Sequence, residues 1–407
     1  MKKAFFPGSF DPFTIGHLAV VCEALKTYDE VVIAIGVNPL KTPMFSVEER
    51  IEMIKKSLDD FLSIVYYHQV TGDVFSSFYE VAEKIENNPD CIKIVYFSGL
   101  PVDAAIKNKA DTLIKGCRSQ EEEKVEKDLM YYNQLSARRR VVHLADIVTS
   151  SDFSYISSSV VKQLMEQKEY IKAQDYVLPS VHNILCRRFL RDEYYNLTSV
   201  GDEGYDFLID KLGNYTFPFS KIACCLKVFR SYKSDNLTHD MSAKEYEMAI
   251  FWFYLIRHSM DLDGKYEKIA HRGMDFELIA KMSGAMNKLL WNETEDCLEG
   301  DILCDVVSAT FGFKGKYSLE AWKSWRNYVN NNERELTYVL YRKELCNRYA
   351  NILPLFKTEY FSEKYGEIAK KNFLREMEGL NVLIEEYKQM SEDDYKARNN
   401  KKSWFEI

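Results

Sequence analysis

The hydrophobic pattern of residues 1–188 switches repeatedly between two periods. Short runs rich in β-branched and aromatic residues predict strands, and apolar residues three and four positions apart predict helices between them. The predicted strands are Lys3–Phe6, Glu30–Val37, Ile92–Phe97, Thr112–Ile114 and Val141–Leu144, and the predicted helices are Leu18–Lys26, Val47–Leu58, Val102–Lys109 and Glu121–Leu135. This alternation favours right-handed crossovers, so we expect a doubly wound α/β domain with a parallel sheet. Residues 63–88 are expected to add a further strand and a helix at Ser76–Ile85.

After about residue 190 the strand pattern stops and only the helical period remains. The helices predicted there are Ala243–His258, Met274–Trp291, Leu319–Val329, Glu333–Ala350 and Glu363–Met390. All five tryptophans lie in this half, whereas most of the prolines precede it. The sequence therefore predicts two domains, an α/β domain over residues 1–188 and an all-α domain over residues 189–407, joined through a helix because no Gly/Ser-rich linker marks the boundary.

Composition and charge exclude several classes of protein. Hydrophobic residues make up 46% and charged residues 29% of the chain, enough apolar material for two cores, which excludes global disorder. No apolar run approaches the roughly 20 residues that span a bilayer, and a Pro-Gly turn interrupts the N-terminal apolar stretch, so neither a membrane segment nor a signal peptide is expected. A net charge of −8 argues against nucleic acid as a partner. Nine cysteines without CxxC spacing suggest reduced thiols, a cytoplasmic location and no zinc site.

The first candidate site follows the first predicted strand, where residues 6–17 read FPGSFDPFTIGH. Ligands bind at the carboxyl ends of parallel strands, and Gly8 would let the backbone approach a phosphate there. Gly16 and His17 stand at the start of the next helix, where free N–H groups and the helix dipole favour an anion. The imidazole could donate to a phosphate oxygen. The structural alternative is a Gly/Pro-rich turn with a capping histidine.

Three further segments carry residues suited to phosphate binding. Lys41, in NPLKTPMF after the second strand, could neutralise a phosphate as a point charge. Lys115 and Arg118 flank a glycine in KGCR at the end of another strand, unless they are only a solvated basic pair. In FSYISSSVVK, three consecutive serines at a helix start could form an anion nest or a simple N-cap.

The strand, the GSFDPxTxGH segment and the following helix together resemble the nucleotidyltransferase superfamily that carries the (H/T)xGH, or HIGH, motif. Four motifs in this order, FPGSFDPFTIGH, FSGLPVD, KGCR and SYISSSVVK, resemble those of bacterial phosphopantetheine adenylyltransferases over about residues 1–188. Nicotinate-mononucleotide adenylyltransferases share the first segment, but they do not usually share the FSGL and ISSS blocks. The resemblance implies transfer of the adenylyl group of ATP to 4′-phosphopantetheine, giving dephospho-CoA and pyrophosphate in coenzyme A biosynthesis.

The resemblance also implies a role for each matching residue. His17 would be the catalytic residue that stabilises the pentacoordinate transition state. Residues matching positions that contact phosphopantetheine are Ser9, Lys41, Pro101, Lys115 and Asn133. Residues matching positions that contact ATP are Ser9, Phe10, His17, Gly116, Cys117, Arg118, Glu126, Phe153, Ser154, Tyr155, Ile156, Ser157, Ser158 and Ser159. Mg²⁺ would bridge phosphates with no dedicated protein ligand, and a homo-oligomer is implied.

The departures from the pattern of the family include Lys115 and Pro101, together with Ser9 in place of threonine and the charged segment Gln120–Lys124. Lys115 stands where the family usually has arginine, so a bidentate phosphate fork becomes a point charge. Pro101 replaces a larger apolar residue at the pantetheine wall. None of these changes removes a group that the chemistry requires.

The helical half weakly resembles metal-dependent HD-type phosphohydrolases. The positions that match their metal ligands hold Phe217, Lys221, Tyr254, Leu255 and Val307. Phenylalanine, tyrosine and leucine cannot replace an imidazole or carboxylate ligand. The His239-Asp240 dipeptide sits in a polar turn, so the domain is predicted to be degenerate and non-catalytic.

Three alternatives remain open from the sequence. The first domain could serve a different phosphorylated acceptor, redirected by Lys115, Pro101 and the inserted segment. It could instead be an ATP-binding sensor whose helical half is an interaction domain. The helical half could also be a working phosphohydrolase.

Overall fold

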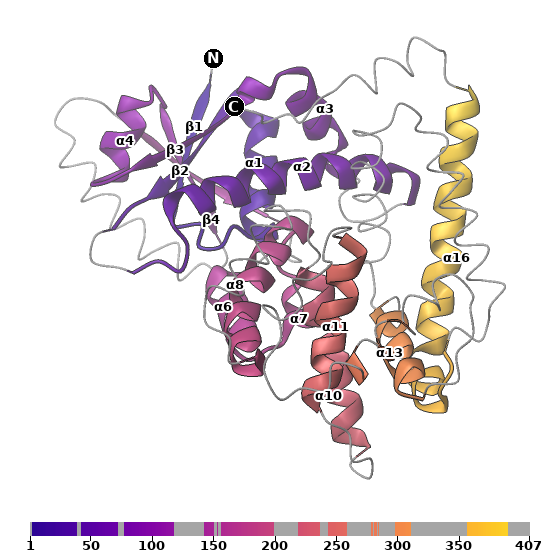
Figure 1. Ribbon diagram of the computed structural model, residues 1–407. Coiled ribbons are helices and arrows are strands. Elements are labelled where there is room, and N and C mark those ends of the chain that lie inside the picture. The colour runs from indigo at the N-terminus through magenta and orange to yellow at the C-terminus, as the bar shows by residue number, and fades with distance from the viewer. Residues whose placement is uncertain are drawn as a thin grey trace. The chain divides into compact units, whose positions relative to one another are not determined.

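The computed structural model describes residues 2–38, 42–71, 77–117, 142–149, 153, 156–198, 219–236, 243–258, 278–279, 281–282, 284, 298–310 and 356–389. These residues form two compact units, each described by itself below (Figure 1). The first unit contains the residues up to Gln167 and Lys172–Val181, and the second contains Lys168–Ile171 and the residues from His182 onward. The division lies inside helix α8 (Pro179–Thr198), which also contains the predicted boundary at residue 188.

The first unit is built on one parallel sheet of five strands in the order β3-β2-β1-β4-β5. The strands are β1 (Lys3–Gly8), β2 (Glu30–Gly36), β3 (Ile92–Phe97), β4 (Thr112–Cys117) and β5 (His143–Val148). The predicted doubly wound α/β fold is confirmed. Strand β1 runs beyond its predicted end at Phe6, because Pro7 and Gly8, which mark a turn in the sequence, still pair with β2.

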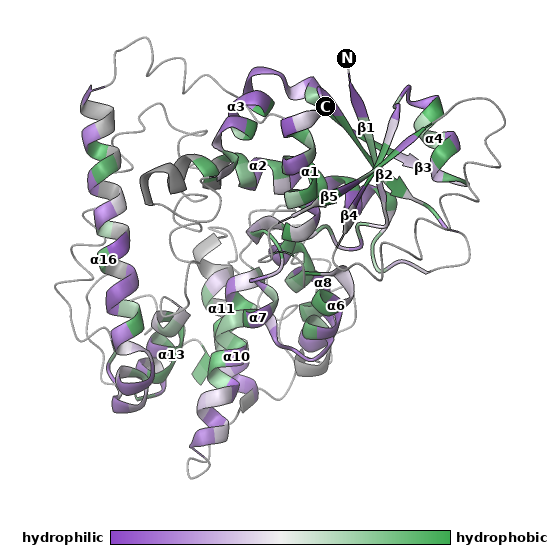
Figure 2. Cartoon of the chain, turned by 180° about the vertical axis from the view of Figure 1, so that it is seen from behind, coloured by the Kyte–Doolittle hydropathy of each residue, from purple (hydrophilic) through white to green (hydrophobic). Residues whose placement is uncertain are grey.

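Helices cover both faces of this sheet (Figure 1). The helices of the unit include α1 (Ile15–Thr27), α2 (Val47–Thr71), α3 (Tyr79–Asn87), α4 (Pro101–Lys107) and α6 (Ser158–Glu166). Phe5, Val32 and Leu113 point from the strands to one face, where they pack against Val102 and Ala105 of α4. Helices α1 and α2 pack on the strands from the opposite face. Because both faces are covered, β2 is hydrophobic nearly throughout (Figure 2).

The further strand predicted within residues 63–88 is wrong for residues 63–71, which continue helix α2. Leu58, Phe61, Leu62 and Val65 are all buried, and their spacing is that of one helical face. This packing overrides the strand preference of the β-branched and aromatic residues that follow. The predicted helix at Ser76–Ile85 is present as α3, and a short 3₁₀ turn, η2 (Pro89–Cys91), leads into β3.

The regular secondary structure described in the second unit is all helical, as the sequence pattern predicts. Besides α8 and part of α7 (Tyr170–Ala173), its helices include α10 (Phe219–Asp235), α11 (Ala243–His258), α13 (Leu298–Ala309) and α16 (Glu359–Gln389). Helix α10 packs against α11 and α13, and α13 packs against α16. The predicted helices at Leu319–Val329 and Glu333–Ala350 lie outside the described residues, as does most of Met274–Trp291. In the described part of the chain, no helix has the length and apolar character of a transmembrane span.

Polar side chains from α7, α8, α10 and α11 form one hydrogen-bonded network in the second unit. Arg230 donates two hydrogen bonds to Glu247, at 2.8 and 2.7 Å, and one to Glu193 at 2.8 Å. The hydroxyl of the buried Tyr170 donates to Glu193 as well. Burial by itself would raise the pKa of Glu193, but Arg230, Tyr170 and Lys168 together hold this pKa below its usual value. The network therefore stabilises an ionised carboxylate between α8 and α10.

Asp305 of α13 holds the start of α16. Its carboxylate accepts hydrogen bonds from the Lys357 amide at 2.8 Å, the Thr358 amide at 2.7 Å and the Thr358 hydroxyl at 2.7 Å. These amides lie just before the first helical residue, Glu359, where backbone N–H groups lack partners within the helix. Burial raises the pKa of Asp305 to about 6, although these three hydrogen bonds oppose the increase.

This pKa predicts a pH dependence of stability. Since the pKa of Asp305 in the folded state, about 6, exceeds the usual value of 3.8, the native carboxyl keeps its proton between these values while the unfolded one loses it. The free energy of unfolding should therefore fall as the pH rises through this window, by on the order of 2 kcal/mol from this group. In Asp305→Asn, which cannot titrate, this component should disappear.

The comparison is made by urea unfolding of both proteins at several pH values from about 4 to 7, below and above this titration. Tryptophan fluorescence reports on the helical part, because all five tryptophans follow residue 189. Identical pH profiles for the wild type and Asp305→Asn would contradict the prediction.

Candidate active site

The candidate site lies where the order of the strands reverses in the sheet. Strand β1 pairs with β2 along its length as far as Gly8, whereas its ladder with β4 covers only Ala4 with Thr112 and Phe5 with Leu113. Beyond these pairs the carboxyl ends of β1 and β4 are not joined to each other. In open parallel sheets such a switch point is the place where ligands bind. The FPGSFDPFTIGH segment follows β1, and Gly116 lies near the end of β4.

His17 occupies the first turn of α1 and is fixed there by a capping box with Thr14. The Thr14 hydroxyl accepts a hydrogen bond from the His17 amide at 3.4 Å, and His17 Nδ1 accepts one from the Thr14 amide at 3.0 Å. Because Nδ1 acts as an acceptor, the proton of the neutral imidazole resides on Nε2. The capping interpretation and the functional one are therefore compatible, since the cap engages Nδ1 and leaves the proton on Nε2.

Three phenylalanine rings surround the imidazole of His17. The ring centroids of Phe6, Phe10 and Phe13 lie 6.4, 5.1 and 5.5 Å from that of His17. All three phenylalanines are buried, and Phe10 has no exposed surface. These contacts restrict the imidazole to one orientation.

The packing of α1 against β4 requires a glycine at position 116. A Cβ atom added there would lie 2.6 Å from Cγ2 of Val20 in α1, far inside van der Waals contact. Val20 is buried, and a valine in a helix has one strongly preferred rotamer, so its methyl group has little freedom to move away. The close approach brings α1, with His17 in its first turn, against the end of β4.

The serine segment lies against the His17 loop. Ser157 is the N-cap of α6, and its hydroxyl accepts from the Val160 amide at 3.2 Å. The Ser158 hydroxyl donates to the Pro12 carbonyl at 2.8 Å, while Ser159 is exposed. If Gly16 had a Cβ atom, that atom would lie 3.3 Å from the carbonyl oxygen of Ile156. The structure therefore brings the first and fourth segments together.

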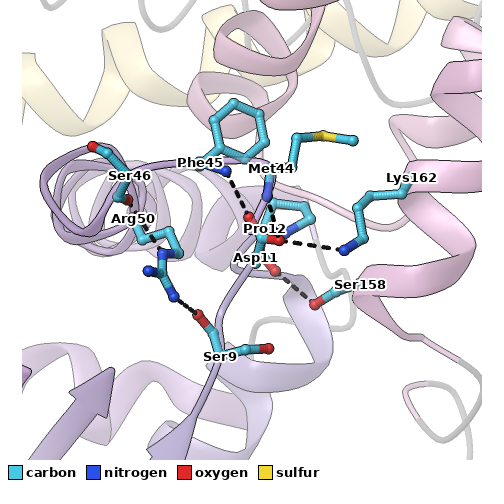
Figure 3. Close-up of polar contacts among 9 residues, drawn as sticks. All are labelled: Ser9, Asp11, Pro12, Met44, Phe45, Ser46, Arg50, Ser158 and Lys162. Carbon is cyan, nitrogen blue, oxygen red and sulfur yellow. Dashed lines mark hydrogen bonds and ion pairs between the residues drawn. The ribbon is translucent and has the colours of Figure 1, made fainter. Parts of the chain in front are cut away.

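Further contacts reach the loop between β1 and α1 from α2, from the segment before α2 and from α6 (Figure 3). Arg50 of α2 donates to the Ser9 carbonyl at 2.9 Å and to the Ser46 carbonyl at 3.2 Å. Asp11, which is 5% exposed, accepts from the backbone around Met44 and from Lys162 of α6. The sequence interpretation did not single out Arg50, Asp11 or Lys162. The sequence offered one signal for this contact, an aspartate within a mostly apolar turn. Its partners could not be predicted, because they are distant in sequence.

The remaining predicted residues are distributed as follows. Ser9 is exposed within the loop, Lys115 is half-buried within β4, and Phe153 is buried. Pro101 begins α4 after the edge strand β3, so β2 separates that strand from β1. For Cys117 only the backbone is described. The predicted site residues that lie outside the described part are Lys41, Arg118, Glu126, Asn133, Ser154 and Tyr155.

The described residues contain no group of three or more His, Cys, Asp or Glu side chains that could hold a metal ion. The carboxylate of Asp11 is engaged by two amides and an ammonium group. Of the HD-like positions, Lys221, Tyr254 and Val307 lie on helices α10, α11 and α13, whereas Phe217 and the His239-Asp240 dipeptide lie outside the described residues.

Comparison with known proteins assigns the site to a class. The cytidylyltransferase-like family matches residues 5–164, a range that contains the His17 loop and the five strands of the sheet except the first two residues of β1. The fold and the site thus define a nucleotidyltransferase. Relatives named phosphopantetheine adenylyltransferase are 33% identical over 184 residues in Clostridium botulinum (strain Langeland), 32% over 165 in Flavobacterium johnsoniae and 30% over 204 in Clostridium perfringens.

These matches cover 44%, 40% and 50% of this chain and 93%, 88% and 100% of the three relatives, respectively. Through its N-terminal part, the chain belongs to the phosphopantetheine adenylyltransferase family. The resemblance inferred from the four motifs is confirmed. Because the cytidylyltransferase-like match ends at residue 164, the HD-like character of the helical half stays a prediction.

The contact between Gly116 and Val20 predicts a specific coupling. Gly116→Ala should destabilise the first unit by about 1–3 kcal/mol, because the new methyl group overlaps a stiff neighbour. In the double variant Gly116→Ala/Val20→Ala the overlap is gone, so the loss should be smaller than the sum of the two single losses. Thermal unfolding of the four proteins measures this coupling, and additive losses would contradict it.

Proposed function

We propose that the first unit transfers the adenylyl group of ATP to 4′-phosphopantetheine, releasing pyrophosphate and forming dephospho-CoA. One observation carries the proposal most directly. The His17 imidazole is fixed at the N-terminus of α1, at the switch point of the sheet, with Nδ1 occupied by the Thr14 amide. The chain matches 93% of the length of a relative named phosphopantetheine adenylyltransferase, and this match supports the choice of reaction.

The chemistry would need positioning and charge stabilisation only. An oxygen of the acceptor's phosphate attacks the α-phosphorus of ATP in line, and the bond from that phosphorus to the α,β-bridging oxygen breaks. No general base is required, because the nucleophile is already an anion. As charge builds on the α-phosphate, His17 Nε2–H donates to a non-bridging oxygen. The amides at the first turn of α1 and the ammonium of Lys115 add positive potential.

Mg²⁺ enters this proposal as part of the substrate, the magnesium complex of ATP. Asp11, the buried carboxylate of the loop, is engaged by amides and Lys162, so it is not assigned as a ligand. A hard cation that keeps most of its waters and binds phosphate oxygens needs few protein ligands.

The helical unit is proposed to be non-catalytic. The proposal is supported by polar groups that hold helices together, namely Arg230 with Glu193 and Glu247, and Asp305 with Thr358. A homo-oligomer and a cytoplasmic location are also proposed. The second is supported by six buried thiols among the described residues, which suit a reducing compartment.

The role of His17 is tested by His17→Ala. Loss of the Nε2–H donor should lower kcat by on the order of 100- to 1,000-fold, the effect of removing one donor to a developing oxyanion. The readout is pyrophosphate release from ATP and 4′-phosphopantetheine. His143→Ala is the matched control, because His143 is exposed at the amino end of β5, and its turnover should equal that of the wild type. Equal turnover of all three proteins would refute the assignment.

The choice of acceptor is tested by a screen with the intact chain. Pyrophosphate should appear when 4′-phosphopantetheine is added and not with nicotinate mononucleotide as the acceptor. Turnover with a different phosphorylated acceptor would identify a redirected nucleotidyltransferase, for which Lys115 and Pro101 are the residues to exchange. ATP binding without turnover on any acceptor would favour a sensor instead.

A further inference from the structure

The carboxylate of Asp11 is the point at which three parts of the first unit meet. Its Oδ1 accepts a hydrogen bond from the Phe45 amide at 3.0 Å, and its Oδ2 accepts one from the Met44 amide at 3.0 Å (Figure 3). The ammonium of Lys162 in α6 approaches Oδ2 to 3.3 Å. One buried side chain therefore joins the His17 loop, the segment before α2 and the serine-capped helix α6.

Helices α2 and α6 hold the backbone on either side of Asp11. Arg50 of α2 donates to the Ser9 carbonyl at 2.9 Å, and the Ser158 hydroxyl of α6 donates to the Pro12 carbonyl at 2.8 Å. The loop is thus held between α2 and α6 at positions 9, 11 and 12. Of these three residues, Asp11 contacts both the segment that leads into α2 and helix α6.

We propose that Asp11 is a positioning residue for adenylyl transfer, an inference that rests on the function proposed above. It fixes the His17 loop relative to the two segments that flank it. The Met44 and Phe45 segment follows Lys41 in the sequence, and α6 follows the cap formed by Ser157. Through these contacts Asp11 sets the distances between groups that bind the two phosphorylated substrates, without touching either substrate.

The arrangement requires a carboxylate. Two divergent amides and an ammonium group need two acceptor oxygens with at least three lone pairs between them. The amide of asparagine offers one oxygen and directs N–H groups toward the other donors. A buried charge is expensive to desolvate, and Asp11 is only 5% exposed, so all three partners are needed to hold it.

A matched structural carboxylate lies elsewhere in the same unit. Asp60 of α2 is also 5% exposed, and it accepts hydrogen bonds from the Ser180 amide at 2.8 Å and the Ser180 hydroxyl at 2.9 Å. These contacts hold the first turn of α8 and involve none of the site residues. Asp60→Asn therefore reproduces the loss of a buried carboxylate without disturbing the His17 loop.

The experiment compares the intact wild type, Asp11→Asn and Asp60→Asn. The readouts are the melting temperature, kcat and KM for ATP and 4′-phosphopantetheine, and hydrogen exchange at the Met44 and Phe45 amides. We expect Asp11→Asn to lower kcat by on the order of 10- to 100-fold, because misplacement by about 1 Å has this effect, with a smaller change in KM. Exchange at Met44 and Phe45 should accelerate. Asp60→Asn should lower the melting temperature but leave kcat and these two amides unchanged.

A second variant, Lys162→Met, separates the two sides of the junction. It removes the partner on α6 and keeps both amide hydrogen bonds, so kcat should fall while Met44 and Phe45 stay protected. Wild-type kcat in Asp11→Asn, or an equal loss of kcat in Asp60→Asn, would overturn the positioning role and leave the proposed function intact. A wild-type chain that releases no pyrophosphate with 4′-phosphopantetheine would overturn both.

Discussion

The reciprocal hydrogen bonds between Thr14 and His17 are the interaction on which the candidate active site depends. They begin helix α1, and they also decide which imidazole nitrogen carries the proton. A free helix N-terminus attracts anions, but it does not place a directed donor among them. Here the cap supplies that donor, and the surrounding phenylalanine rings limit its orientation. The same two bonds therefore stabilise the start of the helix and, in the proposed mechanism, orient the group that acts on the substrate.

Buried carboxylates have different surroundings in the two units. In the first unit, Asp11 joins three chain segments next to the loop that carries His17. In the second unit, Glu193 pairs with Arg230, and Asp305 holds the first amides of α16. These partners belong to the helical packing itself. In both units, therefore, a buried carboxylate joins chain segments that are distant in sequence, and in the first unit one of these segments carries His17.

Much of the fold could be predicted from local patterns. The strand Ile92–Phe97 and the helix Ala243–His258 have the predicted bounds, because each shows an uninterrupted period that its own residues satisfy. Errors arose where packing competes with local preference. The run after Leu62 looks like a strand but continues α2, since Val65 completes a buried helical face. Pro7 and Gly8 look like a turn, yet they pair with β2.

The sequence by itself determined the class of the first unit and the identity of its central histidine, because the glycine, proline and histidine spacing of residues 6–17 is a local constraint on one turn. Only the tertiary structure revealed the contacts of Asp11 with Met44, Phe45 and Lys162, and the contact of Gly116 with Val20. Such contacts join residues far apart along the chain. Their existence depends on how strands and helices pack, which no short segment specifies.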